Sequence, residues 1–276
     1  MATDVSTPPA VRAPTHTPKP GSAEDLGIDR AFVVGLARIP VIAVAWAAAA
    51  WVLSLAVAQL GWFVTISDTA VNVAPLAVIC AGMVVAAVID GVYFKVPNWC
   101  TLSLVVSGWY IGALHDFGAF TIPGLVNPSP DAAGQYGGFL AALGCTAIGF
   151  ACLFPALFIG GMGQGDVKMT MGFGSWLGAY FGLGLGASVL FWSFALGVLI
   201  GGVFGLVIMA MRRQFYKNLA NVREIITDLH VMVTDGPGKA AERANSRRSD
   251  WWRLPYGVPL CVGFLGYLWY AFFVAV

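Results

Sequence analysis

Long apolar stretches are the feature of this sequence that most restricts its fold. Two of them, Pro40 to Val64 and Gly184 to Met211, exceed the roughly 20 residues that a helix needs to cross about 30 Å of hydrocarbon. Apolar residues make up 58% of the 276 positions and charged residues only 11%, which is more apolar surface than one soluble core of this length would bury. The chain is therefore expected to be all-α, with the bilayer as its solvent.

The pattern of apolar runs and turn residues predicts a polytopic membrane protein with about seven transmembrane helices. These helices cover approximately residues 40–63, 72–92, 99–116, 137–160, 167–181, 184–211 and 256–275. Residues 1–38 are a cytoplasmic tail and lead-in, and the composition up to Gly27 predicts disorder there. Because this tail precedes the first apolar run, we expect a retained anchor rather than a cleaved signal peptide. Residues 39–276 then form the membrane domain.

The basic residues all lie on one side of this arrangement. If the N-terminal tail is cytoplasmic, the inside segments hold all 15 Lys and Arg residues and the outside loops hold none. Cytoplasmic loops of membrane proteins carry such an excess of positive charge. This asymmetry predicts a protein of the cytoplasmic (inner) membrane, with its N-terminus inside and its C-terminus outside.

A cytoplasmic segment, residues 212–255, is predicted between the last two spans. Its first part, Arg212 to Val233, has apolar residues at helical spacing with charged residues between them, which is typical of an amphipathic helix. Such a helix can lie on the inner leaflet, dock a partner or cover a site. The rest of the segment is polar and basic, and we expect a flexible loop.

The five cysteines give no sign of a disulfide framework or a zinc site. They are scattered without a CxxC pair and lie in or at the edge of apolar spans, where free Cys usually acts as a small buried hydrophobe. Neither a metal nor another cofactor is predicted. The cysteines are Cys80, Cys100, Cys145, Cys152 and Cys261.

Two aspartates stand out among the acidic residues. Asp90 and Asp166 lie at the inner ends of strongly apolar helices, beside turns that contain Gly or Pro. An acidic group in the bilayer is costly, so it usually lines a site or a water-filled cavity, although the cost falls at the membrane edge. In contrast, His115 and Asp116 lie at the outer end of the third span, where an interfacial role is favoured.

The residues around each aspartate support a functional site. Four glycines within Gly160 to Gly165 allow another helix or an extended peptide to approach closely. No strand precedes this segment and no GK[ST] follows it, which argues against a phosphate-binding loop. After Asp90, Gly91 is suited to ending a helix, and Pro97 with Asn98 to turning the chain and capping the next helix.

Three motifs in order resemble those of the type IV prepilin peptidase family. The sequence GQGDVK at Gly163 to Lys168 is similar to the family's GxGDxK motif. Asp90 followed by KVPN at Lys95 to Asn98 resembles its first aspartate with a basic residue and a Pro-Asn turn. LPYGVP at Leu254 to Pro259 resembles a Pro-aromatic-Gly stretch that opens a late helix.

The resemblance implies a membrane aspartic endopeptidase in which Asp90 and Asp166 are the catalytic pair at the cytoplasmic face. Its substrates would be pilin-like precursors with a short basic leader ahead of an apolar helix, and it implies no nucleic-acid partner. The paired CxxC motifs of bifunctional members are absent, so the resemblance is to the peptidase-only branch, without methyltransferase activity. The supporting residues that it implies are Gly163, Gly165, Lys168, Lys95, Pro97, Asn98, Pro255 and Gly257.

An aspartic dyad needs one ionised carboxylate to activate water and one protonated partner to bind the scissile carbonyl. Two acids in one site hold a single proton between them over a wide pH range, because like charges cannot both ionise freely there. Lys95 and Lys168 would modulate this pair or bind lipid phosphate, although their place on the inner face also accounts for them.

Two other functions compete with this interpretation. Presenilin-type and signal-peptide-peptidase-type proteases also use GxGD, but they place a PAL motif after it, whereas Pro155 to Leu157 precedes it here. A proton or cation transporter would need acids at mid-membrane, and none is evident. A scaffold subunit with a decayed site is a third alternative. The sequence names neither the precursor nor the oligomeric state.

Overall fold

The computed structural model describes residues 30–62, 64–66, 69–117, 137–158, 162–211, 227, 234 and 256–274. The chain divides into two compact units after Ala37. The described part of the first unit is the beginning of α1 (Arg30–Leu60). The second unit contains the remainder of α1 and all other elements. Most of the N-terminal tail and of the predicted segment 212–255 lies outside the described residues.

The second unit is built from helices, as predicted, with one short hairpin. Strands β1 (Val64–Ile66) and β2 (Thr69–Val71) pair antiparallel, with Val64 opposite Val71. This hairpin links the first two predicted spans and was not anticipated. The helices after it are α2 (Ala74–Tyr93), α3 (Asn98–Asp116), α4 (Phe139–Phe158), α5 (Gln164–Met211) and α8 (Gly257–Phe273).

Four helices of the described chain are long and apolar enough to cross a membrane. In addition, the part of α8 from Gly257–Ala271 is an apolar helix that is shorter than these four. The number seven therefore stays a prediction, while a helical protein with several candidate spans is what the structure contains. The four segments are Val33–Leu60, Ala74–Tyr93, Phe139–Leu157 and Gln164–Ile208.

The predicted boundary between the fifth and sixth helices coincides with a break inside α5. Gly182 has φ 80° and ψ 178°, a backbone conformation that is essentially restricted to glycine. The helix therefore changes course where the sequence predicts that one helix ends and the next begins.

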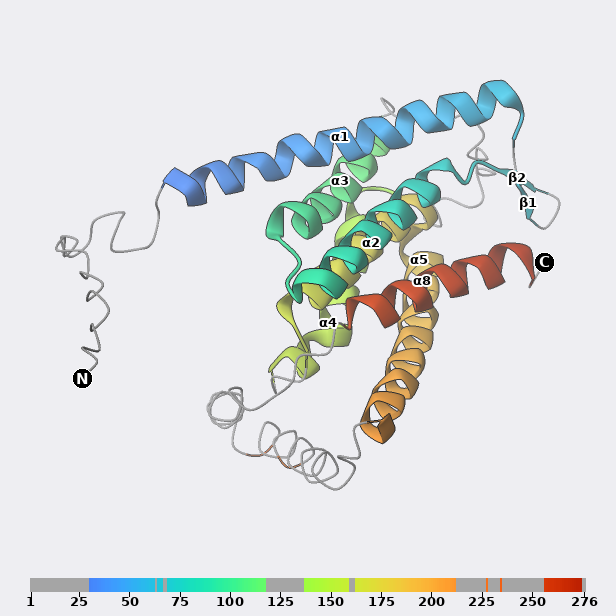
Figure 1. Cartoon of the computed structure of the whole chain (residues 1–276). Helices are drawn as coiled ribbons and strands as arrows, with labels where there is room; N and C mark the ends of the chain where they lie inside the picture. Colours follow the sequence, from blue (N-terminus) through green and yellow to red (C-terminus); the bar gives the residue numbers. More distant parts are fainter. Residues whose placement is uncertain are drawn as a thin grey trace, which may run out of the picture. The chain divides into compact units, whose positions relative to one another are not determined.

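The first half of α5 forms the centre of the bundle, and α3, α4 and α8 pack against α5 (Figure 1). Small residues allow this close approach. A Cβ atom at Gly178 would lie 2.3 Å from the carbonyl oxygen of Ala141, and one at Gly108 would lie 2.8 Å from the backbone of Ser175. The buried Trp176 then joins α5 to α3, because its Nε1 donates a hydrogen bond of 2.9 Å to the carbonyl oxygen of Leu104.

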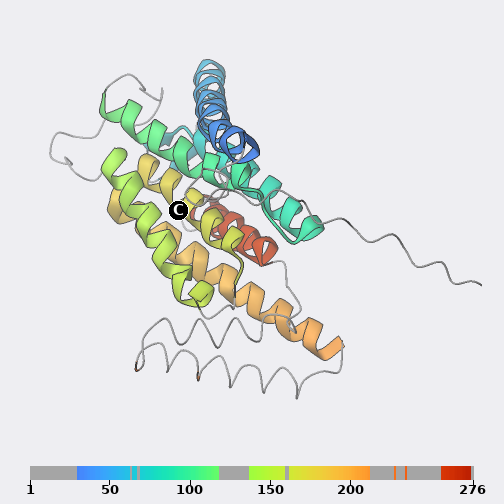
Figure 2. The same ribbon diagram turned by 90° about the vertical axis from the view of Figure 1, so that its left-hand side faces the viewer.

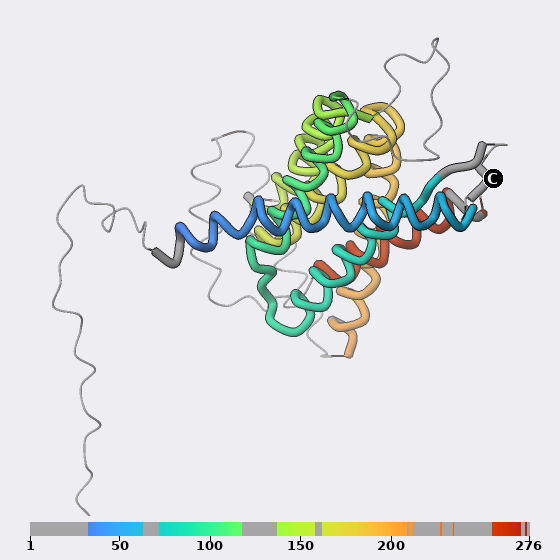
Figure 3. The backbone as a smooth tube through the Cα atoms, turned by 90° about the horizontal axis from the view of Figure 1, so that it is seen from above, coloured from blue at the N-terminus to red at the C-terminus, as the bar shows by residue number. Residues whose placement is uncertain are grey.

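Helix α8 lies between α2 and α5 (Figure 2) and runs beside α2 when seen from above (Figure 3). It is held on α5 by the rings of Phe173 and Phe264, whose centroids are 4.3 Å apart and whose planes differ by 5°. Backbone contact adds to this stack, since a Cβ at Gly263 would lie 2.3 Å from the Cα of Gly197. These contacts hold the middle of α8 against α5.

Polar side chains tie the helix ends together. The buried Asn72 donates from its amide to the carbonyl oxygen of Ser54 on α1 at 3.0 Å, and accepts a hydrogen bond from the N–H of Ala74 at the start of α2. Asp116 accepts a hydrogen bond of 2.8 Å from the N–H of Phe139, so it caps the first turn of α4. This contact gives Asp116 a structural role at the end of α3.

Candidate active site

Asp90 lies in the last turn of α2 and is buried, with 7% of its surface exposed. The helix continues past Gly91 and ends at Phe94, which adopts the left-handed conformation (φ 53°, ψ 26°) and donates its N–H to the carbonyl oxygen of Asp90. The expectation that Gly91 ends the helix was therefore wrong. Asp90 is followed by three more helical residues, and the left-handed cap is made by Phe94 rather than by a glycine.

Asp166 lies in the first turn of α5 and is 4% exposed. Its Oδ2 accepts a hydrogen bond of 3.2 Å from the N–H of Gly163, the residue just before the helix. This is the return bond of a capping box, in which an acidic or amide side chain at the third helical position bonds the N-cap N–H. The spacing of Gly163 and Asp166 is thus the spacing that this bond requires. The other oxygen of Asp166, Oδ1, is buried and has no hydrogen-bond partner among the described residues.

The ends of three helices bring these carboxyl groups together. Asp90 and Asp166 are near enough for their charges to interact, and the N–H of Gly257, the first residue of α8, donates to Oδ2 of Asp90 at 3.0 Å. Tyr256, which precedes it, also faces the site: burial raises the pKa of Tyr256, and the negative charge of Asp166 raises it further. A neutral phenol therefore lies beside two acidic groups.

The two sequence motifs that contain the aspartates also touch through their other residues. Nζ of Lys168 on α5 donates a hydrogen bond of 2.7 Å to Oδ1 of Asn98 at the start of α3. A Cβ atom at Gly165 would lie 3.3 Å from Cγ2 of Val96, in the connection between α2 and α3. Pro97 occupies the N-cap position and makes no side-chain cap bond. The expectation that Asn98 caps α3 was therefore wrong, because its side chain bonds Lys168 instead.

The comparison with protein families agrees with this geometry. The model of the type IV leader peptidase family matches residues 77–208. Over this segment the chain is similar to the type IV leader peptidase family. No curated protein and no solved structure matches it. The resemblance seen in the sequence is confirmed, and the chain is a leader peptidase-like protease with several apolar helices.

The matched part of this leader peptidase-like chain includes Asp90, the connection after α2, and Asp166. It ends before α8, so Gly257 and Tyr256 come to the site from outside the matched region. Pro255, which the motif resemblance also selects, lies outside the described residues. Val96 and Tyr256 fall inside the motifs quoted from the sequence, but nothing in their spacing distinguished them as contact residues.

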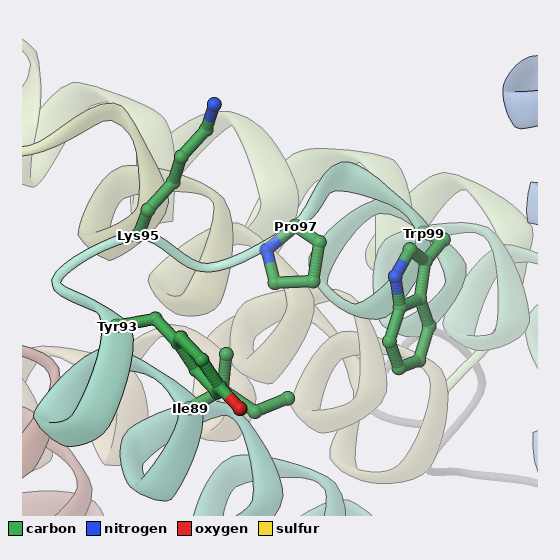
Figure 4. A pocket seen from close by; sticks show the side chains of 5 residues that line it. All are labelled: Ile89, Tyr93, Lys95, Pro97 and Trp99. Atoms are coloured by element: carbon green, nitrogen blue, oxygen red, sulfur yellow. The ribbon is translucent and has the colours of Figure 1, made fainter. Parts of the chain in front are cut away.

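Lys95 lines a pocket of about 260 Å³ at the end of α2, together with Ile89, Tyr93, Pro97 and Trp99. Figure 4 shows Ile89 and Tyr93 on α2 and Trp99 on α3, while the Lys95 side chain extends away from the two α2 residues. The lining includes neither aspartate. The pocket of this leader peptidase-like protein is therefore distinct from the acidic pair, and Lys95 is exposed.

The five cysteines are all free. Within the part of the chain that the structure describes, no three His, Cys, Asp or Glu side chains gather as metal ligands would. The chemistry available to the site residues themselves is acid and base catalysis by the paired carboxyl groups, with backbone N–H groups and a phenol around them.

Proposed function

We propose that this protein is a membrane aspartic endopeptidase that removes the short leader from type IV pilin-like precursors at the cytoplasmic face, with Asp90 and Asp166 as the catalytic residues. The observation that carries the proposal is that these two buried acids, from separate motifs, lie near enough for their charges to interact. The match to the type IV leader peptidase family supports the substrate class.

The arrangement fits hydrolysis by a shared-proton pair. The ionised carboxylate takes a proton from water, and the resulting hydroxide oxygen attacks the carbonyl carbon of the scissile peptide. The protonated carboxyl group donates a hydrogen bond to the carbonyl oxygen, and a proton is then delivered to the leaving nitrogen as the C–N bond breaks. The unpartnered Oδ1 of Asp166 is an acceptor free to receive the proton of that water.

The helix ends do not assign the acid and base roles. Asp166 lies at a helix N-terminus, which favours negative charge, and Asp90 lies near a helix C-terminus, which favours the neutral form. However, Asp90 also accepts the N–H of Gly257 at the N-terminus of α8, so both carboxyl groups are next to a positive helix end. The catalytic pair is therefore proposed as a unit.

The match to the type IV leader peptidase family favours this function over the presenilin-type and transporter alternatives. The position of the pair near helix ends, rather than in the middle of the spans, also suits a leader that meets the membrane surface. We further propose that the protein cleaves without methylating the new N-terminus, since no CxxC pairs are present in the sequence.

The test is cleavage of a pilin-like precursor by the purified protein in liposomes, followed by mass spectrometry of the product. The wild-type protein should release the leader and leave an unmethylated N-terminus. Asp90→Asn and Asp166→Asn should each slow cleavage by at least about 100-fold, because neither carboxyl group can perform both roles.

Asp116→Asn is the matched control. It makes the same chemical change outside the pair and keeps an oxygen that can cap α4, so it should cleave at the wild-type rate. Near-normal cleavage by correctly inserted Asp90→Asn or Asp166→Asn would contradict the proposal. A methylated product would contradict only the proposal that the protein lacks methyltransferase activity.

A further inference from the structure

In each aspartate of the pair, one carboxyl oxygen accepts a hydrogen bond from the backbone N–H of a glycine. Gly163 donates to Oδ2 of Asp166 at 3.2 Å, and Gly257 donates to Oδ2 of Asp90 at 3.0 Å. The first glycine is local to its aspartate, whereas the second is 167 residues away along the chain. Both bonds come from backbone groups at helix starts, which have no partner inside their own helix.

The space at these glycines excludes a side chain. A Cβ atom at Gly257 would lie 2.8 Å from Oδ2 and 3.1 Å from Cβ of Asp90, and one at Gly163 would lie 3.2 Å from Oδ2 of Asp166. The Asp90 carboxyl group would have to move to admit a methyl group at position 257. At position 163 a smaller displacement would be enough.

The position of the Gly257 N–H is set independently of Asp90. Helix α8 is fastened to α5 by the stacked rings of Phe173 and Phe264 and by the backbone contact of Gly263 with Gly197. These contacts lie further along α8 and do not involve the aspartates. The N–H group is therefore presented at a fixed point beside the end of α2.

We propose that Gly257 and Gly163 are positioning residues: their N–H groups fix one oxygen of each aspartate and thereby the orientation of each carboxyl group in the pair. This inference rests on the proposed function. It assigns to α8, which lies outside the matched family region, a part in catalysis through the orientation of Asp90. A purely structural alternative is that Asp90 only caps α8.

The experiment compares two alanine substitutions on the same helix. Gly257→Ala places a methyl group against the Asp90 carboxyl group, whereas a Cβ at Gly266 would lie 3.6 Å from Cδ2 of Leu196, an ordinary contact. For Gly257→Ala we expect kcat for precursor cleavage to fall by about 100-fold, as for a displacement of roughly 1 Å of a reacting group. Its KM should stay within about twofold of the wild-type value, because uniform substrate binding is unchanged.

Gly266→Ala should match the wild-type protein in kcat, KM and melting temperature. The melting temperature of Gly257→Ala should equal that of Gly266→Ala, since the methyl group acts on the carboxyl group and not on the α8 packing. Gly163→Ala should lose less activity than Gly257→Ala, because its added Cβ has the longer contact.

The outcomes separate this inference from the proposed function. Normal kcat for Gly257→Ala, with Asp90→Asn inactive, would overturn the positioning role and leave the catalytic pair. A fall in melting temperature that accounts for the loss of activity in Gly257→Ala would favour the capping role and overturn it as well. Active Asp90→Asn and Asp166→Asn variants would overturn both proposals.

Discussion

Nζ of Lys168 lies 2.7 Å from Oδ1 of Asn98 and donates a hydrogen bond to it. The bond joins the beginning of α5 to the first residue of α3, and thereby the segment that carries Asp166 to the connection that follows Asp90. The two residues belong to different sequence motifs, 70 positions apart. The basic residue of GxGDxK is thus a structural link as well as a charge on the predicted inner face.

This link predicts coupling between Asn98 and Lys168. Asn98→Ala and Lys168→Met should each lower kcat/KM, and the double variant should be no worse than the less active single variant, because both changes remove the same bond. A coupling free energy of about 1 kcal/mol is expected from a double-mutant cycle. Gln164→Ala, at an exposed position of the same turn, is the control and should be neutral. Additive losses would show that the bond does not matter for cleavage.

Gly165 should be sensitive because of Val96. A Cβ at Gly165 would lie 3.3 Å from Cγ2 of Val96, so Gly165→Val should push the connection after α2 away from α5 and reduce cleavage while the protein still inserts. Combining it with Val96→Ala should restore part of the activity, since the smaller side chain makes room. Cleavage is measured on purified, inserted protein. No recovery in the double variant would mean that the glycine serves another purpose.

Phe94 carries a conformational cost at the end of α2. Its φ of 53° is unfavourable by roughly 1 to 2 kcal/mol for a residue with a Cβ atom. Phe94→Gly and Phe94→Ala both lose the ring, but only glycine relieves this cost, so the glycine variant should be more stable than the alanine variant by about 1 kcal/mol. Reversible unfolding in detergent measures the difference. Equal stabilities would contradict the left-handed cap.

The sidedness inferred from charge can be tested by single cysteines in a variant that lacks the five native ones. Ser67→Cys and Pro128→Cys should react with an impermeant thiol reagent from outside intact cells, and Ser246→Cys should react only after the membrane is opened. All three positions lie outside the described residues, so the expectation rests on the distribution of Lys and Arg. Labelling of Ser246→Cys in intact cells would place the proposed active site on the wrong face.

The interior of each helix was predictable, whereas some of the ends were not. Apolar length predicted most helices to within a few residues, although α1 begins at Arg30 and not near residue 40 as predicted, and Gly182 lies at the predicted boundary within α5. The end of α2 lies one residue beyond the predicted residue 92, but Gly91 does not end the helix, because its left-handed C-cap is Phe94, a residue that local preference disfavours there. Asn98 was assigned a cap because its residue type favours that position, yet a bond to Lys168 takes its side chain.

The sequence by itself determined the features that depend on neighbours along the chain. Hydrophobic length and the N-cap spacing of Gly163 and Asp166 arise within a few turns of helix, where the order of residues sets the geometry, and the separation of basic residues follows from the order of the segments along the chain. Only the tertiary structure decided that Gly257 donates to Asp90 and that Tyr256 lies beside Asp166. These contacts depend on how small residues let α8 and α5 approach, and on the stacking of Phe173 with Phe264, because packing between distant segments is set by the fit of whole surfaces and not by local spacing.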